Sequence, residues 1–113
     1  MSARNSLLAS PPYPVEQAIK QLGAHLRTAR LRRNLTIKDV AEKIGTGVRA
    51  ISDAEKGKPS TGIAIYIALL WAYDLHAQFM DVANPAKDEE GLVLASSRER
   101  HRARSKDEID NEF

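Results

Sequence analysis

The 113-residue sequence contains no cysteine, so disulfide bonds, thiol catalysis and cysteine-ligated zinc sites are all excluded. Its longest apolar run, residues 63–73, is too short to span a bilayer core of ~30 Å. Near the N-terminus, Arg4 and Asn5 precede only three apolar residues, so no secretory signal pattern is present. We therefore expect a cytoplasmic protein without a membrane partner.

The chain also lacks the residue groupings that catalysis usually requires. None of its three histidines, His25, His76 and His101, has a partner at the spacing of metal ligands. The glycines at 45–47 lie in a turn and lack the flanking pattern of a phosphate-binding loop. The acids at 88–90 read as a helix start or a solvated patch. We expect no enzymatic activity, no metal site and no cofactor.

The charges that are present are unevenly distributed. The chain is 42% hydrophobic and 28% charged, with a net charge of +2. Residues 20–58 hold ten Lys or Arg against four Asp or Glu, a local charge of +6, whereas residues 107–113 hold four acids and no base. The basic centre suits a polyanion, and the acidic end does not.

The centre of the chain reads as two short helices joined by a tight turn. Thr36 and Asp39 form a variant capping box at the start of the first helix, which Gly45 ends. The second helix opens at 46–47 and stops at 57–59. The apolar positions at helical spacing are Ile37, Val40, Ala41 and Ile44, then Val48, Ile51 and Ala54. A second helix with so narrow an apolar side predicts a helix-turn-helix that lays it in the DNA major groove.

Other helices flank this unit. A helix over 14–33 carries a basic cluster at 27–33, which either complements the helix dipole or contacts phosphate. A short final helix over 74–82 is expected to close the core with Leu75, Phe79 and Val82. The predicted domain spans 14–85 and binds DNA and a second copy. A proline-rich, flexible arm over 1–13 precedes it, either disordered or placing Arg4 on DNA.

The helix capped by Ser60 and Thr61 is apolar on both sides. One stripe, expected to seal the core, comprises Ala64, Ile67, Ala68, Trp71 and Leu75. The other, joined by Gly62, comprises Ile63, Tyr66, Leu69, Leu70 and Tyr73. A small chain has no further layer to cover a second apolar side, so the second stripe predicts a homodimer interface. Cover by the tail or by a different partner stays open.

The charged tail over 86–113 has no apolar stripe to fix it in place. It begins with acids and a short apolar patch at 92–94, continues with alternating arginines at 98–104, and ends in DEIDNEF. It is either disordered or a solvated helix, or it serves as a DNA-phosphate clamp or a partner-docking segment. Ile109 and Phe113 resemble the anchors of a short peptide for a protein groove.

Residues 26–75 resemble the Xre/Cro-type helix-turn-helix family of bacterial and phage regulators. The resemblance rests on LRTARLRRNLTIKDVAEKIG, then TGVRAISDAEKGKPS, then the apolar helix. It implies an all-α, compact five-helix bundle of the lambda-repressor-like kind, which binds a double-stranded DNA operator and is nucleoid-associated. The sequence departs from the family pattern at Ile37, at Thr46-Gly47 and at Val48, so direct base readout has fewer side chains available.

The second half resembles HipB-type antitoxins through GKPSTGIAIYIALLWAYDL, VANPAKDEEGL and the DNEF-like end. This resemblance implies a homodimeric autorepressor that also restrains a HipA-like Ser/Thr kinase toxin, docked partly through residues 87–113. A stand-alone Xre-type regulator with no toxin partner is the alternative.

These patterns assign roles to individual side chains. The expected base contacts are Arg49, Val48, Ala50 and Asp53. The expected phosphate contacts are Thr36, Lys38, Thr46, Ser52, Lys56, Lys58, Arg27 and Arg30. Asp53 either accepts from a cytosine amine or only pairs with Arg49 four residues before it.

Overall fold

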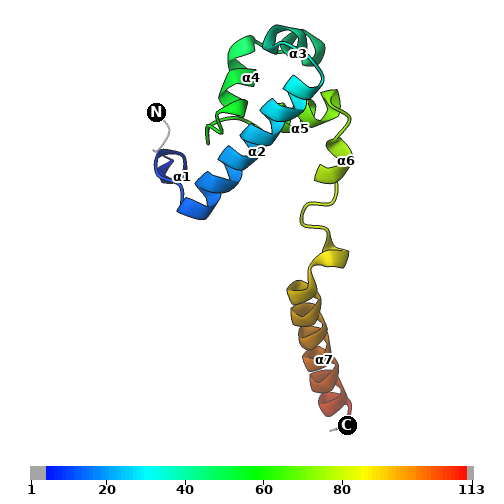
Figure 1. Ribbon diagram of the computed structural model, residues 1–113. Coiled ribbons are helices and arrows are strands. Elements are labelled where there is room, and N and C mark those ends of the chain that lie inside the picture. Colours follow the sequence, from blue (N-terminus) through cyan, green and yellow to red (C-terminus); the bar gives the residue numbers. More distant parts are fainter. Residues whose placement is uncertain (1–4, 112–113) are drawn as a thin grey trace. The chain divides into compact units, whose positions relative to one another are not determined.

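The computed structural model describes residues 5–111, and all regular secondary structure within them is helical (Figure 1). This confirms the predicted all-α fold. The helices are α1 (Ser6–Ala9), α2 (Tyr13–Arg32), α3 (Ile37–Ile44), α4 (Val48–Glu55), α5 (Ile63–Ala72), α6 (His76–Phe79), the 3-10 turn η1 (Pro85–Lys87) and α7 (Glu89–Asn111). The chain divides into two compact units, one ending at Phe79 and the other starting at Met80.

Helix α2 is the scaffold of the first unit. Pro14 lies in its first turn, and its buried residues include Gly23, Leu26 and Ala29. Gly23 lets the backbones of α2 and α4 approach closely, because a Cβ there would lie 2.5 Å from the carbonyl oxygen of Ala54. Gly57 does the same after α4, in the left-handed region at φ 70°, where an added Cβ would lie 2.6 Å from the Cα atom of Lys20.

The two helices of the predicted helix-turn-helix form as expected. The Thr36 hydroxyl accepts from the Asp39 amide at 3.0 Å, and the Asp39 carboxylate accepts from the Thr36 amide at 2.9 Å. Helix α3 ends at Gly45 in the left-handed conformation, and α4 follows from Gly47. The buried residues of the pair are Val40, Ala41, Ile51 and Ala54. Val48, expected at the buried spacing of α4, is 53% exposed instead.

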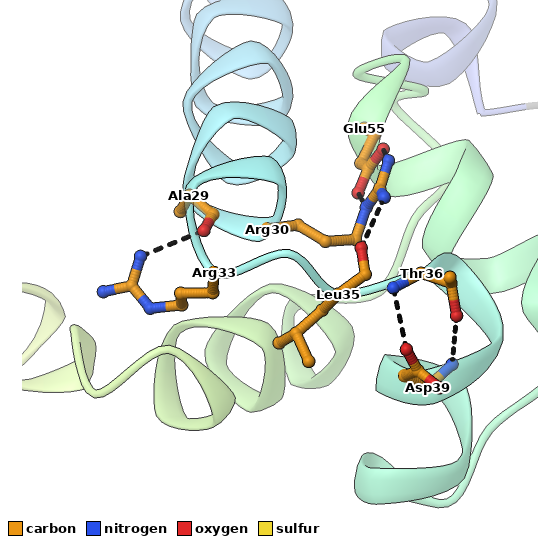
Figure 2. A network of polar contacts seen from close by, with 7 residues as sticks. All are labelled: Ala29, Arg30, Arg33, Leu35, Thr36, Asp39 and Glu55. Atoms are coloured by element: carbon orange, nitrogen blue, oxygen red, sulfur yellow. Dashed lines mark hydrogen bonds and ion pairs between the residues drawn. The ribbon is translucent and has the colours of Figure 1, made fainter.

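A buried ion pair ties α4 to α2 (Figure 2). Arg30 donates from Nε to Glu55 Oε2 at 2.7 Å and from Nη2 to Glu55 Oε1 at 3.0 Å. Its remaining Nη1 donates to the carbonyl of Leu35 at 2.9 Å, just before α3. The two side chains are only 9% and 7% exposed, and the hydrogen bonds to Glu55 raise the pKa of Arg30. The prediction that Arg30 contacts phosphate is therefore wrong, because all three arms of the guanidinium bind within the core.

Helix α5 buries the opposite side from the one predicted. Tyr66, Leu69, Leu70 and Tyr73 lie in the hydrophobic core, packed with residues of α2, α3 and α4. The prediction that these four residues form a dimer interface is wrong. Of the predicted interface, only Ile63 is exposed, at 62%.

The stripe that was expected to seal the core faces outward in part, since Ile67 and Trp71 are exposed. Both stripes repeat every three and four residues, so spacing alone does not choose between them. The buried stripe, with two tyrosines and two leucines, removes more apolar area from water than one that includes two alanines. Arg33 also favours burial of the stripe that contains Tyr73. Its Nη2 donates to the Tyr73 carbonyl at 2.9 Å, and its guanidinium lies 5.6 Å from the Tyr73 ring centre. Burial raises the pKa of Tyr73 to about 12, so this core phenol stays neutral.

Both ends of the chain contain helices. Residues 6–9 of the predicted flexible arm form α1, capped by the Asn5 side chain, while Arg4 lies outside the described residues. The first compact unit ends at Phe79, so the predicted domain over 14–85 extends past it, and Val82 is 62% exposed instead of closing the core. The tail forms one continuous helix, α7, with its first turn capped by Asp88, whose carboxylate accepts from the Gly91 amide. Phe113 lies outside the described residues, as do the side chains after Lys106, Ile109 among them.

Replacing Arg30 with Gln should lower the free energy of unfolding by about 3 kcal/mol, because the Glu55 carboxylate would then be buried without a partner. Urea denaturation followed by circular dichroism measures this change. Lys20→Ala is the matched control, since it breaks the exposed pair with Glu16 and should cost under about 0.5 kcal/mol. Equal losses in the two variants would show that the buried pair does not anchor α4.

Candidate nucleic-acid interface

The outward side of α4 presents a short polar surface. Val48, Arg49 and Lys56 are exposed, and Ala50 and Ser52 are half-buried between them and the core. Arg49 makes no hydrogen bond or ion pair with any other described residue, so its five donors remain available. A guanidinium in this state can bind a guanine edge through two parallel hydrogen bonds, and an exposed valine can contact a thymine methyl group.

Asp53 does not pair with Arg49. Its carboxylate lies 3.2 Å from the Lys58 ammonium, beyond the C-terminal end of α4, and both side chains are partly exposed. Of the two roles expected for Asp53, the ion pair with Arg49 is therefore replaced by an ion pair with Lys58. The positive charge of Lys58 is partly neutralised by this contact, which weakens it as a phosphate contact relative to Lys56.

The starts of α3 and α4 offer backbone and hydroxyl donors. Helix α4 begins at Val48, and its N-cap residue Gly47 has no side chain to cap it, so the first amides keep their hydrogen-bonding capacity. Thr46 lies half-buried just before Gly47. At the start of α3, Thr36 and Lys38 are exposed. The Thr36 oxygen already accepts from the Asp39 amide, which leaves the hydroxyl hydrogen for an external acceptor. Hydrogen bonds from Thr36 hold the pKa of Asp39 below its ordinary value, so the capping carboxylate stays ionised.

The basic cluster at the end of α2 is divided by the fold. Arg33 donates from Nη1 to the Ala29 carbonyl at 3.0 Å, so it completes the C-terminal turn of α2 in the way the helix-dipole interpretation requires (Figure 2). Arg30 is buried in the ion pair with Glu55. Arg27, Arg32 and Arg33 are exposed, but the guanidinium of Arg33 is already bound to the Ala29 and Tyr73 carbonyls. Of the four cations in the cluster, Arg27 and Arg32 are therefore the two that have no hydrogen bond or ion pair with another described residue.

Residues 21–79 match the family model described as Helix-turn-helix domain, which is more than half of the chain. The chain belongs to the helix-turn-helix domain family. The match covers most of α2 and all of α3 to α6, and it supports the resemblance to Xre-type regulators. Comparisons with curated proteins and with solved structures give no match.

Helix-turn-helix domains bind DNA, and the exposed surface of α4 fits this role. In a helix-turn-helix, the second helix of the pair is the one that enters the major groove. Here that helix is α4, whose outward residues are those described above. Among the described residues, no group of three or more His, Asp or Glu side chains is placed to hold a metal ion, and no helix is long and apolar enough to cross a membrane.

Two features of the helix-turn-helix domain were not predicted from the sequence. Glu55 holds the recognition helix in place, yet its spacing on α4 gives no sign of a partner 25 residues earlier. Lys43 places its ammonium 5.7 Å from the centre of the exposed Trp71 ring, which joins α3 to the outward side of α5. This contact could not be predicted, because Lys43 and Trp71 are 28 positions apart in the sequence.

Proposed function

We propose that this helix-turn-helix protein is a sequence-specific transcriptional repressor that binds a double-stranded operator as a homodimer. The observation that carries the proposal is Arg49, exposed and unpaired among the described residues, on a recognition helix that Arg30 and Glu55 fix to the scaffold. The backbone of such a fixed helix loses little conformational freedom on binding, and the planar guanidinium of Arg49 matches the two acceptors of a guanine edge.

The remaining roles follow from exposure and charge. Beside Arg49, the base contacts are Val48, Ala50 and Asp53, the last only if DNA competes with Lys58 for its carboxylate. Phosphates are met by Thr36, Lys38, Thr46, Ser52, Lys56, Lys58 and Arg27. Because so few side chains read bases directly, the spacing of the two half-sites and the shape of the DNA supply part of the specificity.

Arg49→Ala should lose about 1–3 kcal/mol of discrimination at one base pair in each half-site, with smaller effects elsewhere. The measurement is a panel of binding titrations on an operator and its single-base variants. Lys38→Ala is the control, since an exposed lysine that meets phosphate should weaken all sequences equally and reduce the salt slope by about 1. If Arg49→Ala behaves like Lys38→Ala, Arg49 binds phosphate and does not read a base.

The homodimer is proposed to form through the outward stripe of α5, in place of the buried stripe. Ile63 and Trp71 are 62% and 54% exposed, and Ile67, one turn from each, is also exposed. Together with Ala64 they form an apolar strip along the whole helix, which a monomer would leave in water. A symmetric pairing of two such strips covers both at once and places two recognition helices on one duplex.

Replacing Ile63 and Ile67 together with Glu should convert the dimer to a monomer, because four carboxylates would meet at the symmetric contact. Sedimentation equilibrium measures the mass, and circular dichroism checks that the exposed positions tolerate the change. Leu31→Glu is the matched control, since Leu31 is a half-exposed apolar residue of α2 outside the strip. A dimer that persists in the double variant would move the interface elsewhere.

We further propose that the repressor is the antitoxin of a HipA-like kinase toxin. The second unit supports a partner-docking role through its exposed apolar residues. Leu92, Val93 and Leu94 are each more than half exposed on the first turns of α7, and Met80 and Val82 are exposed before it. Such side chains on a separate unit suit a protein partner better than water.

Purification from the native host should then yield a complex with a larger kinase-like subunit, and deleting residues 87–113 should abolish it. Mass spectrometry of the intact assembly identifies the subunit. The deleted protein should keep its helix-turn-helix unit, which ends before the deletion. Recovery of the full-length protein without a partner would favour the stand-alone regulator.

A further inference from the structure

The second half of α7 is a dense array of cations. Between residues 98 and 106 the helix carries four arginines and one lysine against the single acid Glu99, a net charge of +4. All of these side chains are exposed. Neither the helix-turn-helix surface nor the apolar patch at 92–94 involves them.

The like charges of this array repel one another and destabilise the helix that carries them. Arg98 and Arg102 are four residues apart, and so are Arg100 and Arg104, so like charges are neighbours on the helix surface and destabilise it. Arg98, Arg100 and Arg102 make no ion pair or hydrogen bond with any other described side chain. A bound polyanion would neutralise this repulsion and stabilise α7.

The arrangement of the charges indicates which polyanion fits. At 100° per residue, Arg98 and Arg102 lie on one side of the helix, Arg100 and Arg104 lie on the opposite side, and His101 lies between the two. A flat protein surface would meet only one of these sides. A DNA groove about 12 Å wide admits a helix about 10–12 Å across and presents phosphates along both of its walls.

We propose that residues 98–106 of α7 form a second DNA-contacting element, which binds phosphates of the duplex beside the sequence read by α4. The inference rests on the proposed DNA-binding function, because α4 is what brings α7 to the duplex. Residues 80–88 lie between the end of the first unit and the start of α7, and this length of chain spans at most about 30 Å, comparable to one turn of B-DNA at about 34 Å. Once one unit is bound, the short tether keeps the other at high local concentration.

The test compares the full-length protein with the variant R98Q/R100Q/R102Q on a 30-base-pair duplex of random sequence, by fluorescence anisotropy between 50 and 200 mM KCl. Each lost phosphate contact removes about 0.9 from the salt slope, so across this range the wild-type affinity should fall roughly 40-fold more than that of the variant. Glutamine is a good helix former and removes the repulsion, so α7 should keep its helicity by circular dichroism. Lys87→Gln is the control, because Lys87 is an exposed cation of the same unit that pairs with Asp81.

Three results would overturn the inference. If the triple variant had the same salt slope as wild type, α7 would make no contact with DNA phosphates and α4 alone would bind the duplex. If Lys87→Gln lowered the salt slope as much as the triple variant does, the effect would come from the net charge of the protein and not from the arginines of α7. An unchanged slope together with loss of a co-purifying protein would assign the array to a protein partner. Absence of any wild-type binding to the duplex would instead remove the proposed function itself.

Discussion

The Arg30–Glu55 pair is the constraint on which the arrangement of the first unit depends. It joins the scaffold helix α2 to the end of the recognition helix α4, and through the Leu35 carbonyl it also fixes the chain just before α3. A helix with two fully buried residues, Ile51 and Ala54, has too little apolar surface to be held by packing alone. The pair and the close backbone contacts at Gly23 and Gly57 supply the missing attachment, so the outward side of α4 can be given over to a partner.

The local features were predictable from the sequence because they depend on residues close together. The capping box of Thr36 and Asp39, the left-handed stop at Gly45 and the helical spacing of α3 are each set within four residues. The exposed surface of α4 was predictable only in part, because Val48 was expected at a buried position and is exposed. The sequence also left a pair between Arg49 and Asp53 open, whereas the structure pairs Asp53 with Lys58.

The features that were missed depend on contacts across the fold. The role of Arg30 is decided by Glu55 on another helix, and an arginine at the edge of a helix core looks the same in the sequence whether it pairs inward or points outward. Helix α5 is apolar on both sides, so its core stripe is chosen by what packs against it, including Arg33 at the Tyr73 carbonyl. The helicity of α7 was one of the alternatives that the sequence left open, and it has a different cause, since α7 lacks an apolar stripe and its arginines, glutamates and alanines favour a helix.

The central claim is that two α4 helices, presented by a dimer, read a short symmetric DNA sequence. Selection of bound duplexes from a random pool, followed by sequencing, tests it most directly. The account predicts enrichment of an inverted repeat whose half-sites are separated by about one helical turn, with a guanine in each half-site for Arg49. Recovery of sequences with no common motif, or of a single asymmetric site, would contradict it.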